Sequence, residues 1–499
     1  METPDIIDSR NGEILSAASC YRALAAKDVR FDGVFFTGVR TTGIYCRPVC
    51  GVKTPRASSC VFFNSAAAAE AAGFRPCLRC RPELAPYALQ QNLAHAVWQR
   101  IAAGALNDGD TERLADEVGL SSRQLRRVLL QHFGVTPVEL AQTQRLLFAK
   151  KLLQETHLPM SDVAYAAGFG SIRRFNALFQ SRYGMAPTAI RRATETSAPT
   201  APDALTLRLA YRPPFAWDAM MQYVGRRATP GVEACVCNDG RWEYARSIRL
   251  DGAVGWMRVV HLAQRNQLEL SLSASLAPVL MPLVARMHRQ FDLDANPDVI
   301  ALHLSADPLL AVQIARTPGL RVPGAFDTFE LALRAVLGQQ VSVAGATTVC
   351  GRLARLFGDE ADTPFAGVTH HFPSAERLAA LAATEIAAIG VPISRAETVR
   401  NLAAFAMQGG LQPRPGTRLQ EAIAQLKTVR GVGEWTAQYI AMRALRFPDA
   451  FPAGDLGLQK AAVESEQGGR LTERQLNARA AHWSPWRSYA ALLLWHSLA

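Results

Sequence analysis

The chain has 499 residues, which is too long for one ordinary hydrophobic core and predicts several domains. It carries 54 Lys and Arg against 43 Asp and Glu, a net charge of +11 that favours a polyanionic partner such as nucleic acid. No apolar run is long enough to cross a membrane and no signal segment is visible, so we expect a protein of the reducing cytosol with no membrane partner.

Four cysteines in two tight pairs stand out in the N-terminal part, after a short helix that we expect around residues 14–26. Cys46 and Cys50 have three residues between them, and Cys77 and Cys80 have two. Two close thiol pairs joined by a longer loop provide the ligands of a tetrahedral zinc site. Disulfide bonds are the alternative, but the total of nine cysteines is odd and no signal peptide precedes them.

Arginines surround these cysteines in the sequence, at Arg40, Arg47, Arg75, Arg79 and Arg81. A site that meets a phosphodiester needs such cations, whereas a purely structural zinc knuckle does not. The segment resembles the N-terminal domain of Ada-type response proteins, in which a zinc-bound cysteine removes the methyl group from a methylphosphotriester in DNA. Zinc keeps a sulfur deprotonated at neutral pH, and a thiolate is the nucleophile that a methyl ester requires.

The resemblance implies one zinc ion, both structural and catalytic, in a small α+β module over residues 1–90. Its ligands would be Cys46, Cys50, Cys77 and Cys80, and the methyl acceptor would be Cys46. The side chains near the phosphate would be Arg40, Thr42 and Arg75. Because nothing obvious would remove the methyl thioether afterwards, we expect each molecule to react once.

The pattern from residue 93 onward is helical and contains an internal repeat. Residues 114–137 return as residues 163–187 with one inserted residue. Each copy has two helices separated by a turn, at Gly119 in the first and at Gly168 in the second. This arrangement predicts two helix-turn-helix units in an all-α domain over residues 91–192.

The second helix of each unit carries arginines where a helix in the major groove would present them. These residues are Arg123, Arg126 and Arg127 in the first unit and Arg173 and Arg174 in the second. The segment resembles the AraC-type regulatory domain, in which two such units enter successive major grooves, and the same domain follows the zinc module in Ada-type proteins. The alternative is a helical bundle whose basic residues form a solvated face.

A linker is predicted over residues 193–204, which are small and polar and include proline. Five segments with strand-like alternation follow, together with helical stretches. We therefore expect an antiparallel sheet backed by helices, in an α+β domain over residues 205–297. Cys235 and Cys237 lie one residue apart in this part, and without a second pair they are expected to be buried apolar thiols rather than metal ligands.

The C-terminal part, residues 298–499, is expected to be an all-α domain with short loops. Within it, residues 426–439 predict a helix-hairpin-helix. The glycines of this motif, Gly431 and Gly433, let backbone N–H groups at a helix N-terminus bind a DNA phosphate. Alone, such a hairpin is only moderately specific for DNA.

An aspartate, Asp455, lies twenty residues beyond Trp435 of the hairpin. That pairing resembles the helix-hairpin-helix DNA glycosylases, and within them the AlkA-type 3-methyladenine glycosylases. Residues 337–343, residues 483–490 and Trp495 also match this family. The resemblance covers both the sheet domain and the helical domain that follows it.

The resemblance implies that Asp455 is the catalytic carboxylate, because breaking an N-glycosidic bond builds positive charge on the deoxyribose. The base pocket would consist of aromatic side chains that suit a base made cationic by alkylation, namely Trp435, Tyr439 and Trp495. The alternatives are that Asp455 only caps the following helix and that the aromatic residues belong to the core. DNA contacts would come from Gly431, Gly433, Thr436, Gln339 and Gln340.

Two positions depart from the best-known pattern of this family. Gln340 stands in place of an apolar wedge, and His496 replaces an aromatic residue after the pocket tryptophan, which leaves the substrate range open. Trp435 stands where strand-nicking glycosylases of this fold carry a lysine, so we expect a monofunctional enzyme. We expect a monovalent cation at the hairpin backbone but no iron–sulfur cluster, because Cys350 is the only cysteine after Cys237.

These patterns together predict a multidomain, mainly α protein for DNA alkylation repair and response. It would excise alkylated purines of the 3-methyladenine type, and its one-shot methyl transfer would activate transcription of repair genes. The alternative from a different class is a regulator whose C-terminal half binds DNA without catalysis. Expected partners are double-stranded DNA, at damaged and promoter sites, and RNA polymerase, with the chain acting as a monomer at the nucleoid of a bacterial cytoplasm.

Overall fold

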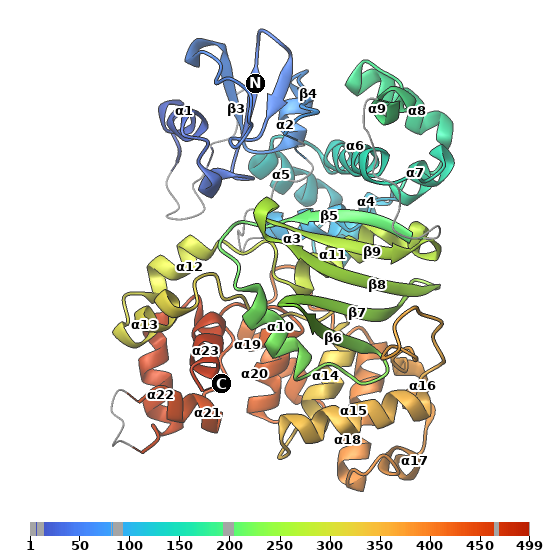
Figure 1. Cartoon of the computed structure of the whole chain (residues 1–499), viewed down its shortest axis with the longest axis vertical. Helices are drawn as coiled ribbons and strands as arrows, with labels where there is room; N and C mark the ends of the chain where they lie inside the picture. The colour runs from blue at the N-terminus through green and yellow to red at the C-terminus, as the bar shows by residue number, and fades with distance from the viewer. Residues whose placement is uncertain are drawn as a thin grey trace.

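The computed structural model describes residue 6 and residues 14–80, 82, 93–192, 204–463 and 469–498. Figure 1 shows the parts stacked in chain order, with the four-cysteine module and the helix-turn-helix part at one end, a sheet across the middle and a helical part at the other end. The protein is multidomain and mainly helical, as the sequence predicts. The predicted linker lies outside the described residues except for Ala204, which begins the sheet.

The four-cysteine module is a small α+β unit. Its sheet has the order β3-β1-β2-β4 and is antiparallel except for the parallel pair of β2 with β4. Phe36, Tyr45 and Phe63 pack with alanines of α2 to form its core. The elements are α1 (Ala17–Ala25), β1 (Phe36–Val39), β2 (Ile44–Cys46), β3 (Cys60–Phe63), α2 (Ala66–Ala71) and β4 (Arg75–Pro76).

The predicted repeat is confirmed in the helical part that follows. Ser121 and Ser171 accept a backbone N–H at the start of α5 and α8, and Gly134 and Gly184 end these helices with φ of 72° and 70°. Glycine adopts this left-handed conformation without strain, so both units start and stop in the same way. The helices are α3 (Leu93–Ala102), α4 (Thr111–Glu117), α5 (Ser122–Phe133), α6 (Pro137–Glu155), α7 (Met160–Ala166), α8 (Ile172–Tyr183) and α9 (Pro187–Arg192).

The predicted antiparallel sheet is confirmed, with the strand order β5-β9-β8-β7-β6. Leu207 of β5 and Val259 of β8 both lie opposite Leu270 of β9, and all three pack into one core with methionines of α10 and α11. The alternation of apolar residues along these strands therefore marks their buried face. The elements are β5 (Ala204–Ala210), α10 (Trp217–Gly225), β6 (Glu233–Asn238), β7 (Arg241–Leu250), β8 (Ala253–Leu262), β9 (Gln267–Ser273) and α11 (Leu280–Gln290).

The outer strand β5 is covered by helix α6 of the preceding part. The Glu155 carboxylate accepts a hydrogen bond from the backbone N–H of Arg208 at 3.0 Å, and Lys151 donates to the carbonyl of the same residue. Lys151 and Glu155 also pair with each other at 2.9 Å, and both are buried. An uncovered edge strand is a template for pairing with other chains, so α6 protects the sheet while joining the two parts.

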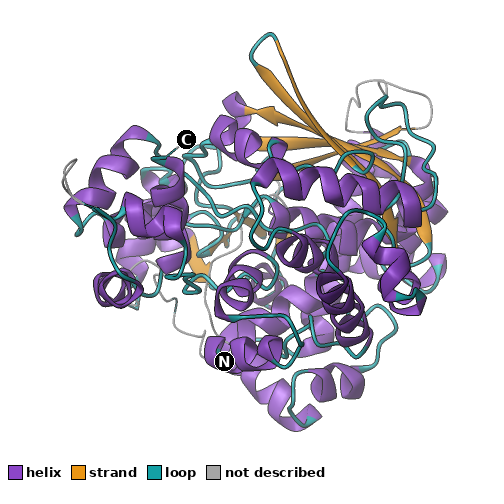
Figure 2. Ribbon diagram, turned by 90° about the horizontal axis from the view of Figure 1, so that it is seen from below, coloured by secondary structure: helices purple, strands orange, loops and turns teal. Residues whose placement is uncertain are grey.

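The C-terminal part is helical, as predicted, and Figure 2 shows that helices make up most of the molecule outside the fan of long strands. Leu333 of α14, Leu402 of α18 and Ile440 of α20 are fully buried in its core. The helices are α12 (Pro297–Leu304), α13 (Pro308–Arg316), α14 (Thr328–Leu337), α15 (Val343–Phe357), α16 (Ala375–Ala380), α17 (Ala383–Ala387), α18 (Ile393–Met407), α19 (Leu419–Lys427), α20 (Glu434–Arg443), α21 (Leu456–Ala461), α22 (Glu473–Ala480) and α23 (Arg487–His496).

All nine cysteines are free thiols, so the disulfide alternative is wrong. The expectation of buried thiols in β6 is also wrong for Cys237, which is exposed, whereas Cys235 packs partly against the core. The reason is that β6 is an edge strand whose last three residues are exposed. Among the helices of the described ranges, none is long and apolar enough to span a bilayer.

Candidate functional site

The four predicted metal ligands, Cys46, Cys50, Cys77 and Cys80, converge in one place. Their sulfur atoms all lie within 4.8 Å of one another, and only Cys80 is not fully buried. The parallel pairing of β2 with β4 explains this convergence. Tyr45 lies opposite Pro76, so Cys46 and Cys77 at the next positions lie side by side. Four thiols at this spacing form the donor set of a closed tetrahedral zinc site.

The electrostatics of the cluster also fit a divalent cation. The hydrogen bond from Cys46 to Cys50 raises the pKa of Cys46 above the ordinary thiol value, and the hydrogen bond from Cys80 to Cys46 does the same for Cys80. Hydrogen bonds from Cys46 lower the pKa of Cys77, and they lower the pKa of Cys50 to about 7. Four neighbouring thiolates repel one another, and a zinc ion held by these cysteines would supply the positive charge that lets all four ionise.

The side chains around the four cysteines include an exposed group and one arginine that turns inward. The exposed group consists of Arg40, Thr42, Arg75 and Arg79. Arg81 lies outside the described residues. Arg47 instead turns inward, because its backbone N–H donates to the Cys80 sulfur at 3.4 Å and its guanidinium pairs with Asp32. Arg47 therefore positions the metal loop and is not available to a DNA phosphate.

The four-cysteine module contacts the helix-turn-helix part on one side and the sheet domain on the other. Lys150 of α6 is fully buried, and its Nζ donates to the Cys77 carbonyl at 3.1 Å. From the other side, Arg212 after β5 donates to the Asp32 carbonyl at 2.8 Å and to the Asp294 carbonyl at 3.1 Å. Sequence reasoning missed these contacts, because each joins residues far apart in the chain and neither belongs to a periodic pattern.

The predicted groove-facing arginines are all exposed on α5 and α8. They are Arg123, Arg126, Arg127, Arg173 and Arg174. The opposite face of each helix is buried, through Leu125 and Leu129 in α5 and through Phe175 and Phe179 in α8. One polar face of each second helix is therefore free to enter a DNA groove.

The predicted helix-hairpin-helix is formed by α19 and α20. Gly431 has a φ of +96°, and a Cβ atom at this residue would lie 2.0 Å from Oγ1 of Thr398, so the turn requires glycine. Gly433 precedes α20 without a side-chain cap, and a Cβ there would meet nothing within 4 Å. The first N–H groups of α20 are therefore open to an anion, as a phosphate site at a helix N-terminus requires.

Two residues predicted to contact DNA instead contact each other. Gln339 Nε2 donates to Thr436 Oγ1 at 2.9 Å and to the Gly431 carbonyl at 3.0 Å. Thr436 is buried and its side chain holds the hairpin against the Gln-Gln loop, so its backbone N–H, in the first turn of α20, is the group left for a phosphate. Gln340 at the tip of that loop is exposed and has a φ of +58°, a left-handed conformation that costs a non-glycine residue about 1 kcal/mol.

The carboxylate of Asp455 is held by both of the predicted pocket tryptophans. Trp435 Nε1 donates to Oδ2 and Trp495 Nε1 donates to Oδ1, each at 3.0 Å. Oδ1 also accepts the backbone N–H of Leu458 at 3.0 Å, so Asp455 caps α21. The capping alternative is thus correct as far as it goes, and the same three donors fix a negative charge beside the aromatic side chains.

Those aromatic side chains form a continuous wall. The rings of Trp435 and Tyr439 stack with centroids 5.3 Å apart and planes 10° apart, and Tyr439 and Trp495 are tilted at 57° with centroids 6.2 Å apart. Both tryptophans are half-buried. Burial lowers the pKa of His496, the residue after Trp495, and so favours its neutral ring. The sequence predicted this grouping but not the indole hydrogen bonds, although a buried indole N–H usually finds an acceptor.

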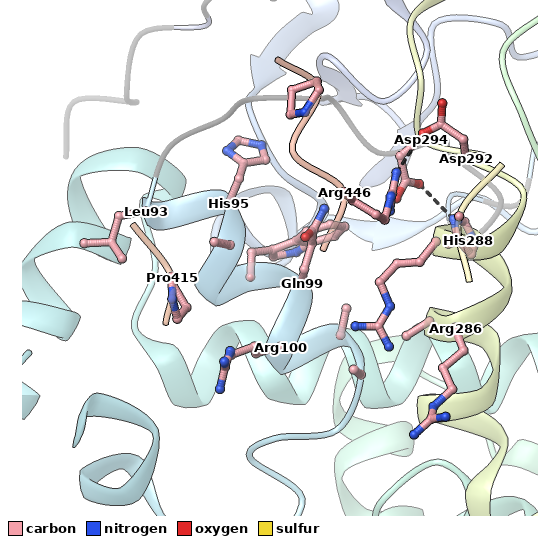
Figure 3. Close-up of a pocket in the computed structure, with 18 of the residues that line it drawn as sticks. Leu93, His95, Gln99, Arg100, Arg286, His288, Asp292, Asp294, Pro415 and Arg446 are labelled. Atoms are coloured by element: carbon pink, nitrogen blue, oxygen red, sulfur yellow. Dashed lines mark hydrogen bonds and ion pairs between the residues drawn. The ribbon is translucent and has the colours of Figure 1, made fainter. Parts of the chain in front are cut away.

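A separate cavity of about 1870 Å³ lies between α3, α11 and loops of the helical part (Figure 3). Two pairs of polar side chains in its lining bind each other: Arg446 forms a salt bridge with Asp292 at 2.7 Å, and His288 Nδ1 lies 2.8 Å from Oδ1 of Asp294. Asp455 and the aromatic wall do not line this cavity, so it is distinct from the predicted base pocket.

Family models match most of the chain in four successive segments. They are the metal binding domain of Ada over residues 19–83, a helix-turn-helix domain over residues 114–193, the AlkA N-terminal domain over residues 206–327 and the HhH-GPD superfamily base excision DNA repair protein over residues 333–485. The helical-bundle alternative for the second segment is therefore wrong.

One relative matches almost the whole chain. The Mycobacterium tuberculosis protein described as probable bifunctional transcriptional activator/DNA repair enzyme AlkA is 40% identical over 486 residues, which are 96% of each chain. The chain belongs to this bifunctional family. Two segments of the chain are similar to Escherichia coli proteins. DNA-3-methyladenine glycosylase 2 is 34% identical over 58% of this chain and 96% of its own length. The bifunctional transcriptional activator/DNA repair enzyme Ada is 39% identical over 23% of this chain and 33% of its own length.

Proposed function

We propose that the C-terminal half excises alkylated purines from DNA and that the N-terminal half accepts methyl groups and controls transcription. The observation that carries base excision is a carboxylate, Asp455, fixed by two indole N–H groups beside an open helix-hairpin-helix. A regulator that only grips DNA needs no such carboxylate in an aromatic pocket. Chromatography of bases freed from methylated duplex DNA tests this proposal, and the absence of any released base would favour the non-catalytic alternative.

In the proposed excision, the alkylated purine leaves the base stack and lies against Trp435 and Tyr439, whose π faces attract a cationic base. Asp455 stabilises the positive charge that develops on the deoxyribose as the N-glycosidic bond breaks, and the base departs with the bonding electrons. The same carboxylate orients the water that adds to C1′ of the sugar. Gln340, at the exposed tip of its loop, fills the gap that the base leaves.

We expect this glycosylase to leave an intact abasic strand, because no lysine occupies the hairpin position of Trp435. From residue 205 onward the sequence has only Lys427, which pairs with Glu434 at 2.8 Å, and Lys460 on α21. Duplex DNA with an alkylated purine, treated with protein and borohydride, should yield free base and alkali-labile sites without a covalent adduct. A trapped adduct that disappears in Lys427→Ala or Lys460→Ala would show that an amine, not water, is the nucleophile.

In the N-terminal half we propose Cys46 as the methyl acceptor. Its sulfur attacks the methyl carbon of the phosphotriester, the carbon–oxygen bond breaks, and the DNA keeps a phosphodiester. Zinc held by the four cysteines keeps this sulfur ionised. Cys46 ends β2, and the exposed Arg40 and Thr42 belong to the turn before this strand, while Arg75 lies opposite Ile44 on β4. These side chains could therefore meet the phosphate around one sulfur.

We expect methylation of Cys46 to strengthen promoter binding by α5 and α8. Four thiolates around one divalent ion carry two net negative charges, and methylation removes one, which lowers repulsion of DNA phosphates by about 1 kcal/mol, or roughly fivefold in affinity. Titration of a promoter fragment with methylated and unmethylated protein should show this difference at low salt and lose it at high salt. Equal affinities at low salt would rule out an electrostatic switch.

Within this proposal, promoter-bound protein recruits RNA polymerase, and the chain acts as a monomer at the bacterial nucleoid. A monovalent cation at the hairpin backbone assists phosphate binding, which the open N-terminus of α20 supports. The chemistry of either half needs no iron–sulfur cluster.

A further inference from the structure

A buried arginine, Arg443, contacts Tyr439 of the aromatic wall. Arg443 of α20 is only 4% exposed, and among the described residues its guanidinium forms no salt bridge. Its Nη1 donates to the hydroxyl of Tyr439 at 2.7 Å and to the hydroxyl of Tyr223 at 2.9 Å. Nε and Nη2 donate to the carbonyls of Pro323 and Gly324. Both phenol oxygens therefore act as acceptors toward the same positive charge.

Tyr223, which contacts Arg443, belongs to the sheet domain. It lies on α10, which is next to α20 in Figure 1, and its hydroxyl oxygen is 3.5 Å from that of Tyr439. The guanidinium of Arg227 covers its ring at 3.7 Å from the centroid, and the side chain is half-buried. The sheet domain therefore adds a polar side chain to a pocket that the sequence assigned to the helical part alone.

The hydrogen-bonding capacity of this pair decides what it can recognise. Each phenol has one proton to donate, and Arg443 already occupies the acceptor side of both oxygens. One proton can bridge the two hydroxyls, and the other remains for an acceptor in the pocket. Although burial opposes the effect, Arg443 and Arg227 lower the pKa of Tyr439 to about 8, and a more acidic hydroxyl is a stronger donor.

We propose that Tyr223 and Tyr439, positioned by Arg443, form a hydrogen-bond-donating edge of the base pocket that favours alkylated or deaminated purines with a carbonyl oxygen at C6 over purines with an amino group at C6. A carbonyl accepts the phenol proton, whereas an amino group meets it donor to donor and leaves both groups without a partner. The inference rests on the proposed base excision. It makes Tyr223 a specificity-determining residue and Arg443 a positioning residue.

The test compares the release of three bases from the same duplex context: 7-methylguanine and hypoxanthine, which have a carbonyl at C6, and 3-methyladenine, which has an amino group at C6. Tyr223→Phe keeps the ring but removes the hydroxyl. It should lower kcat/KM for the two carbonyl bases about tenfold, the effect of one lost hydrogen bond, and change that for 3-methyladenine by less than about twofold. Tyr439→Phe should shift the ratio in the same direction.

A matched control is Tyr211→Phe. Tyr211 follows β5 in the same domain, and its hydroxyl contacts His261 at 2.5 Å, away from the pocket, so the three rates should keep their wild-type ratio. The affinity of Tyr223→Phe for DNA with an abasic analogue, which places no base in the pocket, should also equal that of the wild type.

Two results would overturn the inference. An equal fall for all three bases would show that Tyr223 only packs the pocket, and unchanged release of every base would show that its hydroxyl does not meet the base. Failure of base excision itself would look different, because the wild type would then release none of the three bases.

Discussion

Replacing Asp455 with asparagine should lower base release from alkylated DNA by at least about 100-fold, because a neutral amide cannot stabilise the developing cationic sugar. In the wild type each carboxylate oxygen accepts an indole N–H at 3.0 Å. Asparagine replaces one of these oxygens with an NH₂ group, which cannot accept, so one of the two hydrogen bonds should be lost. Asparagine caps a helix as well as aspartate does, so α21 should remain folded. Single-turnover release of 3-methyladenine measures the effect.

Asp307 provides a matched control for this substitution. It caps α13 through the Leu309 N–H at 2.9 Å and accepts Nε1 of Trp483 at 2.9 Å, much as Asp455 does, but it pairs with Arg479 at 3.0 Å and lies outside the base pocket. Asp307→Asn should lower the thermal stability while leaving base release per folded molecule within about twofold. Equal losses of release in the two variants would mean that Asp455 is only structural.

Replacing Cys77 with serine should abolish zinc binding and unfold the four-cysteine module, because a structural zinc ion contributes on the order of 10 kcal/mol to such a fold. Methyl uptake from methylphosphotriester DNA should fall below detection. Base release should persist, since the catalytic carboxylate belongs to the helical part. Metal analysis and peptide mass spectrometry measure the two N-terminal effects, and in the wild type they should find one zinc per chain and one methyl group on Cys46.

The corresponding control is Cys60→Ser. Cys60 begins β3 outside the metal cluster, is half-buried, and its sulfur donates to the Arg56 carbonyl at 3.4 Å. This variant should therefore retain one zinc and accept one methyl group. A methyl group found on Cys60 or on the buried Cys20 of the wild type would contradict the assignment of Cys46.

The features that sequence analysis predicted correctly are local ones. The two cysteine pairs, the repeated helix-turn-helix pattern, the alternating strands and the Gly-Val-Gly hairpin each depend on residues a few positions apart, where spacing fixes geometry. The grouping of Trp435 with Asp455 came from a family resemblance rather than from periodicity. The structure adds that the indole donates a hydrogen bond to the carboxylate.

The features that sequence analysis missed depend on tertiary packing. The side chain of Thr436 is buried and accepts a hydrogen bond from Gln339, and Arg47 turns away from the surface toward Asp32. Tyr223 contacts the hydroxyl of Tyr439 from a position 216 residues earlier in the chain. No pattern of spacing reports which way a polar side chain points or which distant element it meets, because these depend on how separate parts of the chain dock.

The cover that α6 places over β5 also matters while the chain is being synthesised. β5 (Ala204–Ala210) leaves the ribosome well before β9 (Gln267–Ser273), the strand with which it pairs. Since N-terminal segments fold first during synthesis, α6 is already complete when β5 emerges. Glu155 and Lys151 can then hold the backbone of Arg208 before β9 arrives, so the outer edge of the nascent strand is not free to pair with neighbouring nascent chains.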